Sequence, residues 1–287
     1  MVYFTSSRDV VTQDCFGVDL VAQGIIDFHT HAFPDELALR AMKKLLAEAP
    51  GVNAFLDGTI TALLDSMKRN GIGRSVICCI ATSPEQFTPI FNWCRKVRTD
   101  RLIMFPSIHP ADAKWKERIA LIKAEGFKGV KMHPYYQDFR LDEDVMLSIY
   151  EELARNDLMV AVHTGFDIAF AKDDRADCRR ILKVTEMFPQ LKFVTTHLGA
   201  WQQWDEVEKN LAGKHIYMEL SWSLECLSVE QARRIILAHP ADCVLFGTDS
   251  PWTDQHKTLS LFKNLKLPEE LERKILRDNA VTLLGLL

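Results

Sequence analysis

The amino-acid sequence predicts a single-domain (β/α)8 barrel, in which eight parallel strands alternate with helices. Eight short apolar segments recur over about 260 residues, and a helical pattern follows each of them. The segments are apolar throughout, as expected for strands that are buried on both faces of a parallel sheet. A doubly wound open sheet is the alternative. No glycine-rich loop follows the first segment, however, so a dinucleotide-binding fold is not supported.

The elements follow one another in a regular order after an N-terminal lead of residues 1–24. The first strand is expected at residues 25–31, and helices at 35–49 and 59–70 come next. Thr59 is suited to cap the second of these helices, and Gly71 to end it. The other strands are expected at residues 75–80, 102–108, 127–132, 158–162, 191–196, 215–220 and 243–247. The helices after them are expected at residues 83–98, 112–125, 142–156, 174–188, 203–211, 228–238 and from 255 to the end. We find no linker and no sequence repeat, so one domain over residues 1–287 is the simplest organisation.

Composition narrows the classes of function. The formal net charge is −4 with both signs mixed along the chain, which gives no argument for nucleic acid or a membrane surface as partner. Residues 1–24 lack the pattern of a secretory signal, and no apolar run approaches the ~20 residues of a membrane span. The seven cysteines form no Cys-x-x-Cys pair, which indicates a reducing compartment. We therefore expect a cytoplasmic protein that acts on a small molecule, with a homodimer as the default assembly.

The first predicted strand ends in two histidines, His29 and His31. Side chains alternate along a strand with a period of two, so these two imidazoles point the same way. Neutral imidazoles are common ligands for zinc and similar ions. The pair is therefore half of a candidate metal site. The alternative is two partly buried histidines that bond to the backbone.

Polar residues recur at the C-terminal ends of the other strands, where barrel enzymes carry their active sites. Six of the nine histidines fall at this end, and His215, His239 and His256 fall elsewhere and are expected to be structural. The candidates at strand ends are His29, His31, His109, Lys131, His133, His163, His197 and Asp249. Among these, His29, His31, His163 and Asp249 offer three imidazoles and a carboxylate. That set suits one divalent ion, first of all Zn²⁺, with Mn²⁺, Co²⁺ or Fe²⁺ as alternatives.

The motifs at these strand ends resemble those of the metal-dependent amidohydrolase superfamily, in particular its amidohydrolase family 2 branch. The resemblance spans the chain from the first strand to the eighth. It is carried by Asp27-Phe28-His29-Thr30-His31, Lys131-Met132-His133-Pro134, His163-Thr164-Gly165, Thr196-His197-Leu198-Gly199 and Gly247-Thr248-Asp249-Ser250. It implies a barrel whose metal is held by His29, His31, His163 and Asp249, with His197 as a catalytic residue that faces substrate. Many members carry an extra β-sandwich built from both termini, which we do not expect here because about 24 residues precede the first strand and the end is predicted to be helical.

Lys131 has three interpretations. In two-metal members of the superfamily, a lysine on the fourth strand is carbamylated and bridges the metals, and His197 would then bind a second ion. Without a carbamate, Lys131 would bind a substrate carboxylate as an ammonium. In the third interpretation its charged head is simply solvated at the rim. A lysine must lose its proton before it reacts with CO₂, so the first case requires burial or nearby positive charge.

Two further residues are candidates for substrate contact. His133 lies two residues after Lys131 and would share its face, and Trp252 follows the eighth strand. Other aromatic residues follow strand ends and are expected either to line an apolar pocket or to pack, namely Tyr135, Tyr136, Trp201 and Trp222.

The first expectation for function is hydrolysis of a lactone, ester or amide by a metal-activated water. Asp249 would move the proton and His197 would stabilise the oxyanion. Asp27 would orient a histidine ligand. The alternative is a lyase, a non-oxidative decarboxylase or hydratase of an aromatic or unsaturated acid, in which Arg140 or Arg175 would read the carboxylate. A third possibility is an inactive barrel kept as a scaffold.

Overall fold

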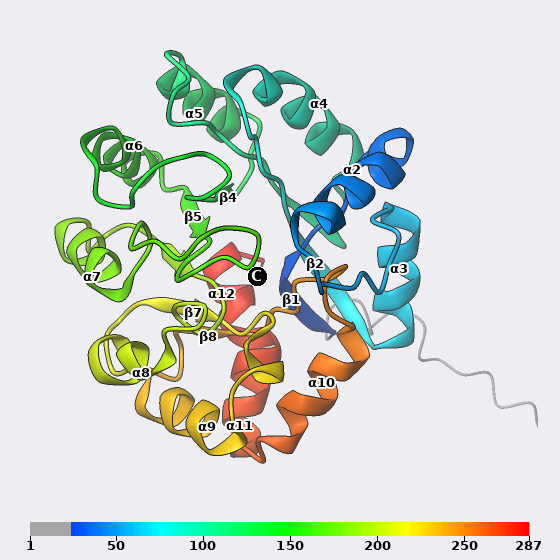
Figure 1. Ribbon diagram of the computed structural model, residues 1–287, viewed down its shortest axis with the longest axis vertical. Coiled ribbons are helices and arrows are strands. Elements are labelled where there is room, and N and C mark those ends of the chain that lie inside the picture. Colours follow the sequence, from blue (N-terminus) through cyan, green and yellow to red (C-terminus); the bar gives the residue numbers. More distant parts are fainter. Residues whose placement is uncertain (1–23, 287) are drawn as a thin grey trace, which may run out of the picture.

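Eight parallel strands form a ring with helices around it in the computed structural model, which describes residues 24–286 (Figure 1). The predicted lead of residues 1–24 lies, except for its last residue, outside the described residues. The strands are β1 (Ile25–Thr30), β2 (Ile72–Cys78), β3 (Leu102–Phe105), β4 (Gly129–Met132), β5 (Met159–Val162), β6 (Phe193–Thr195), β7 (Tyr217–Glu219) and β8 (Val244–Leu245).

The helices that follow the strands are α2 (Asp35–Glu48), α3 (Ile60–Arg69), α4 (Phe87–Val97), α5 (Trp115–Ala124), α6 (Asp144–Arg155), α7 (Cys178–Met187), α8 (Trp204–Glu206), α9 (Val229–Ala238), α10 (Gln255–Asn264), α11 (Glu269–Arg273) and α12 (Asn279–Leu284). Short turns extend them at Pro84–Gln86, Val207–Leu211, Ser223–Glu225 and Lys274–Asp278. The predicted caps of α3 are confirmed: the Thr59 side chain accepts from the Ala62 N–H, and Gly71 has a φ of +67°. The helix predicted at 203–211 is instead one turn of α8 followed by a π-helical turn.

The ladder joins β1–β2–β3 and β4–β5–β6–β7–β8 in parallel register, and single contacts close the ring between these two groups. The Lys131 N–H donates to the Pro106 carbonyl at 2.9 Å, which joins β4 to the end of β3. The Phe28 N–H donates to the Phe246 carbonyl at 2.8 Å, and Thr30 pairs with Ser250, which joins β1 to the β8 end. The predicted (β/α)8 barrel is therefore confirmed, and the described residues include no accessory β-sandwich.

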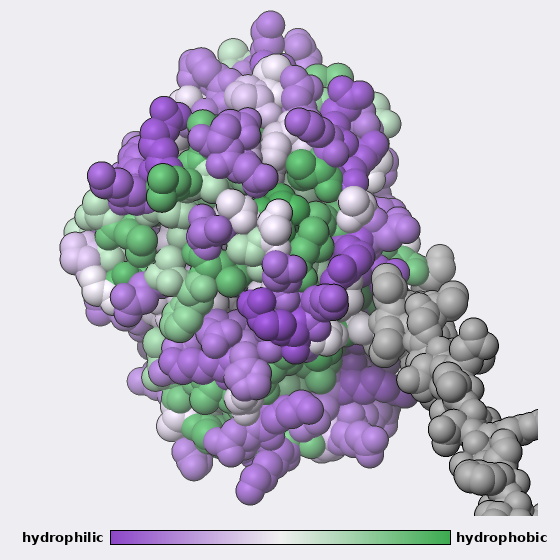
Figure 2. Space-filling view, turned by 90° about the vertical axis from the view of Figure 1, so that its right-hand side faces the viewer, coloured by the Kyte–Doolittle hydropathy of each residue, from purple (hydrophilic) through white to green (hydrophobic). Residues whose placement is uncertain are grey.

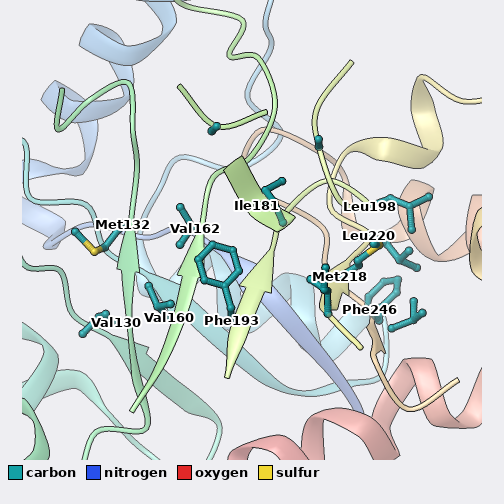
Figure 3. Close-up of a cluster of buried hydrophobic side chains, with 14 of the residues drawn as sticks. Val130, Met132, Val160, Val162, Ile181, Phe193, Leu198, Met218, Leu220 and Phe246 are labelled. Carbon is teal, nitrogen blue, oxygen red and sulfur yellow. The ribbon is translucent and has the colours of Figure 1, made fainter. Parts of the chain in front are cut away.

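Side chains alternate between two apolar layers, one outside and one inside the ring. Val130, Met132, Val160 and Val162 point outward from β4 and β5 toward the helices, where Ile181 of α7 meets them (Figure 3). Inside the ring, a second buried cluster joins strand residues such as Met159, Ala161 and Leu245 to α12.

α12 lies across the centre of the ring in the view of Figure 1. Its residues Ala280, Val281, Leu283 and Leu284 pack on the inner cluster. Because this helix closes the N-terminal end of the barrel, the C-terminal end is the one left for polar chemistry.

The outer surface shown in Figure 2 is mostly hydrophilic, with apolar patches between the polar side chains. Within residues 24–286, no helix combines the length and the apolar character that a membrane crossing demands.

Candidate active site

Polar side chains gather where the C-terminal ends of the strands meet, as the sequence predicted. Each of them is 7% exposed or less, apart from His31, whose side chain is 11% exposed. The buried members are His29, Lys131, His133, His163, His197, Glu219 and Asp249. His109, at the end of the third strand, is not among them: its Nδ1 accepts from the Ala111 N–H, a structural contact.

Three of the predicted ligands converge on one point. His29 Nε2 lies 3.1 Å from His31 Nε2. Asp249 Oδ1 lies 3.1 Å from His31 Nε2 and 3.5 Å from His29 Nε2. The register of β1 shifts between Asp27 and Thr30, and such a bulge re-aims the side chains beside it.

The hydrogen bonds at the Nδ1 atoms of His29 and His31 show which nitrogen of each ring carries a proton. The Nδ1–H of His31 donates to the Cys78 carbonyl at 2.7 Å. The Nδ1 of His29 lies 3.0 Å from Glu219 Oε1, a carboxylate oxygen that accepts. In the neutral rings both Nε2 atoms therefore carry lone pairs, and they face each other and a carboxylate. Three electron-pair acceptors this close repel one another, so the donor set fits a divalent cation.

Lys131 is fully buried at 1% exposed, and its Nζ lies 3.2 Å from His29 Nε2. The interpretation of a solvated head at the rim is therefore wrong. The Lys131 side chain thus ends beside the acceptor cluster formed by His29, His31 and Asp249. It also lowers the pKa of His29, although burial of that ring is the larger cause.

His163 lies outside this cluster and faces His197. The Nε2–H of His163 donates to the Phe166 carbonyl at 2.9 Å, and the Nδ1–H of His197 donates to the Ser221 carbonyl at 3.0 Å. The remaining nitrogens, His163 Nδ1 and His197 Nε2, are thus both acceptors, and they lie 3.0 Å apart. A cation or a hydrogen-bond donor that engages both would relieve their repulsion.

His133 and His163 stack at 4.2 Å with an interplanar angle of 15°, and Asp167 lies beside both rings. Asp167 Oδ2 is 3.3 Å from His133 Nε2 and 3.6 Å from His163 Nε2. His133, His163 and Asp167 form a second group of close ligand atoms. The Nδ1 of His133 is buried without a hydrogen-bond partner in the structure, which leaves it free to accept from a ligand.

Aromatic rings surround these histidines. Tyr135 contacts His163 at 6.0 Å between ring centroids, and Trp201 contacts His197 at 5.4 Å. Trp222 packs on Trp201 at 5.4 Å. Trp252 is half-buried, and its backbone N–H donates to the Asp249 carbonyl at 2.9 Å. An apolar wall thus lies beside the imidazoles, as the aromatic loop residues suggested.

Two residues of the site were not predicted, and one predicted role is wrong. The unpredicted residues are Glu219, which contacts the His29 ring, and Asp167, which contacts His133. The position of Glu219 at a strand end was a signal in the sequence, whereas nothing in the sequence singled out Asp167. Asp27 does not orient a ligand ring. Its carboxylate instead accepts from the N–H and hydroxyl of Thr248 and from Gln255 of α10.

We expect the metal-free protein to lose stability in acid. Burial is the main cause that lowers the pKa of His163 and His197 to about 3, and that of His133 to about 4. Burial also lowers the pKa of His29, so the unfolded chain binds four more protons at these histidines as the pH falls below 6.5. In the opposite direction, burial raises the pKa of Asp27 to about 7, and the folded protein binds that proton. The four histidines outnumber Asp27, so the free energy of unfolding is expected to fall as the pH drops from 7 to 5. Urea unfolding with EDTA at pH 7 and pH 5 measures this, and equal stability at both would contradict it.

Solved structures of several proteins share this fold at low sequence identity. A 5-carboxyvanillate decarboxylase from Sphingomonas paucimobilis is 14% identical with a TM-score of 0.68, over 92% of this chain and 99% of that one. A dihydroxybenzoic acid decarboxylase from Polaromonas, with bound manganese and the inhibitor 2-nitroresorcinol, is 16% identical with a TM-score of 0.67, over 92% and 97%. An uncharacterised TIM-barrel protein from Bordetella bronchiseptica is 19% identical with a TM-score of 0.70, over 91% and 98%. No curated relative matches the chain.

These comparisons correct the first functional expectation. Several of the similar structures are decarboxylases of aromatic acids, among them those of 2,6-dihydroxybenzoate and 5-carboxyvanillate. The prediction of a hydrolase that acts on a lactone, ester or amide is therefore wrong, and the alternative of a metal-dependent decarboxylase is the one that the comparisons support.

The family itself rests on a match along nearly the whole chain. The amidohydrolase family model covers residues 26–286, from β1 to the end of α12. This range includes each motif at the strand ends on which the resemblance was based. The protein belongs to the amidohydrolase family, in the branch called amidohydrolase family 2.

Proposed function

We propose that the protein is a metal-dependent, non-oxidative decarboxylase of an aromatic or unsaturated carboxylic acid. One observation carries the proposal: a cluster of acceptors that fits a cation lies beside a buried ammonium and an uncharged imidazole. The acceptors are His29, His31 and Asp249, the ammonium is Lys131, and the imidazole is His197. The decarboxylases that share the fold support the same reaction.

The metal would be held by His29 Nε2, His31 Nε2 and Asp249 Oδ1. His163 is the proposed fourth ligand because the resemblance implies it and its Nδ1 carries a lone pair, although in the structure this ring lies outside the group formed by His29, His31 and Asp249. Zn²⁺ was the first expectation, but the manganese in a decarboxylase of the same fold supports Mn²⁺. When bound, the ion would orient the substrate and stabilise negative charge that develops on its oxygen atoms.

Lys131 would bind the substrate carboxylate through an ion pair. The two arginines considered for this role are already paired: Arg140 with Asp173 and Asp174, and Arg175 with Asp138 and Asp173. The ring of the substrate would lie against the aromatic wall, with Trp252 and the free Nδ1 of His133 as further proposed contacts.

The reaction replaces a carboxylate by a hydrogen atom. His197 Nε2 would accept a hydrogen bond from a substrate hydroxyl and hold the ring in place. Asp249 would take a proton from that hydroxyl or from water and deliver it to the carbon that bears the carboxylate. The bond between this carbon and the carboxylate then breaks, its electron pair returns to the ring as CO₂ leaves, and the added proton balances the loss.

The proposal is tested by CO₂ release from a panel of acids, namely 2,6-dihydroxybenzoate, 5-carboxyvanillate and unsaturated dicarboxylates. Protein loaded with Mn²⁺ or Zn²⁺ should release CO₂ from at least one aromatic acid, in step with loss of substrate absorbance. Loss of substrate with no CO₂ would instead indicate hydration or hydrolysis and would refute the proposal.

Replacing Lys131 by methionine should raise KM for the acid about 10- to 100-fold, since a hydrogen bond to a charged group is lost. Methionine is an unbranched side chain one heavy atom shorter than lysine, so it fills most of the buried position while it removes the charge and the hydrogen-bond donors. Lys172→Met is the matched control, because Lys172 is an exposed lysine in the loop after β5. If Lys131 is carbamylated instead, ¹³C-bicarbonate will give a carbamate resonance that the variant lacks, and the ammonium role would be excluded.

A further inference from the structure

We propose that Glu219 is a positioning residue that holds the metal-facing tautomer of His29 and the backbone of His197 at the same time. The inference rests on the proposed metal site, and it concerns a carboxylate at the end of β7 that is 1% exposed. The contacts of its two oxygen atoms separate this role from that of a metal ligand.

The first contact is with His29. Glu219 Oε1 lies 3.0 Å from His29 Nδ1 and accepts a hydrogen bond from it, with Ser221 Oγ also 3.0 Å from this nitrogen, so the Nε2 of the ring is left with a lone pair toward His31 and Asp249. Carboxylates that fix a histidine ligand in this way also raise its basicity toward the metal. Without the carboxylate, His29 could take the other tautomer and present a proton to the cation.

The second contact is with the backbone on either side of the His197 ring. The His197 N–H donates to Glu219 Oε1 at 3.1 Å, and His197 has a φ of +58°, in the left-handed region that costs energy for residues other than glycine. The Ser221 N–H donates to Oε2 and its hydroxyl donates to Oε1, each at 2.7 Å. The carbonyl of Ser221 in turn accepts from His197 Nδ1.

Glu219 is not part of the group of close ligand atoms that His29, His31 and Asp249 form, and both of its oxygen atoms already accept hydrogen bonds. Oε1 accepts from His29, His197 and the Ser221 hydroxyl, and Oε2 accepts from the Ser221 N–H. One carboxylate thus connects a proposed metal ligand to the proposed substrate-binding imidazole. A change at Glu219 should disturb both.

The end of the neighbouring strand, β8, leaves space for this carboxylate at Gly247. A Cβ at Gly247 would lie 2.2 Å from Glu219 Oε2, so only glycine leaves room for the side chain there. Gly247→Ala therefore offers a second perturbation, which displaces the carboxylate without removing its charge.

The test compares Mn²⁺ affinity, read from the electron paramagnetic resonance signal of free Mn²⁺, in the wild type and Glu219→Gln. We expect affinity to fall about 10- to 100-fold and kcat to fall with it, while the thermal unfolding midpoint stays close to that of the wild type. Asp112→Asn is the matched control: Asp112 is a buried carboxylate whose partners are Lys114 and Arg118, and its loss should leave Mn²⁺ affinity unchanged. Unchanged affinity in folded Glu219→Gln would overturn the inference.

A measurement on the wild type covers the case in which Glu219→Gln and Gly247→Ala both fail to fold. Nitrogen-15 NMR of the metal-free protein should show the Nδ1–H tautomer for His29 and His197, and an Nε2–H tautomer for His29 would overturn the inference. These readouts do not depend on the reaction. If the wild type binds Mn²⁺ and releases no CO₂, the proposed function fails while the role of Glu219 is still decided by affinity and tautomer.

Discussion

Asp249→Asn is expected to weaken Mn²⁺ binding by ~100-fold or more and to lower kcat/KM for decarboxylation by about 10²–10⁴-fold. The substitution keeps the shape of the side chain but removes the only carboxylate of the acceptor cluster. His29 and His31 would then bind the cation without a negatively charged ligand beside them. The side chain that is proposed to deliver a proton to the substrate carbon would also be missing. Calorimetric titration with Mn²⁺ and the CO₂ assay measure the two effects separately.

Asp254→Asn is the matched control for this experiment. Asp254 follows the same strand and caps α10, where its side chain accepts from the His256 N–H. The control should leave both Mn²⁺ affinity and turnover unchanged. Full turnover in Asp249→Asn would show that another group carries the proton.

His197→Gln is expected to lower kcat by about 10²–10⁴-fold with Mn²⁺ affinity within a few-fold of the wild type. This split follows from the geometry. The resemblance makes His197 a residue that faces substrate, and its ring is not among the close ligand atoms of His29, His31 and Asp249, so the ring would act on substrate. Steady-state CO₂ release and Mn²⁺ titration of the same sample give the two values.

His256→Gln serves as the control for His197, because His256 is an exposed histidine in α10. It should not change either value. A loss of Mn²⁺ affinity in His197→Gln as large as that in Asp249→Asn would make His197 a metal ligand and would support a second ion bridged by Lys131.

The barrel was predictable because each strand is a continuous apolar run between helices with recognisable ends. The apolar residues of β4 and β5 face two packed layers, which is why their runs contain no polar alternation until Lys131 and His163. Strand ends were less predictable. β8 has two residues, since Gly247 and Asp249 leave the ladder to build the site.

The sequence identified the residues of the site better than it identified the contacts among them. His29, His31 and Asp249 come together as expected. His163 lies outside this group, and its imidazole faces that of His197. The alternation of side chains along a strand correctly placed both histidines of β1 on one face. The shift in the register between β1 and β2 beside Asp27 could not be predicted from the sequence. Beside this shift Asp27 reaches Gln255 of α10, whereas Glu219 of β7, two strands away from β1, contacts the imidazole of His29.

Carboxylates outside the motifs were the least predictable part. Asp167 lies in a loop, and a charged loop residue is ordinarily solvated. Only the fold shows that its oxygen meets two stacked imidazoles.

We propose that one divalent cation, held at His29, His31 and Asp249, is needed for the release of CO₂. Its most direct test is a titration of metal-free protein with Mn²⁺, with CO₂ release from an aromatic acid measured at each addition. We expect no CO₂ without metal, and a rate that rises with Mn²⁺ and levels off at one equivalent. CO₂ release that survives complete removal of metal would contradict it.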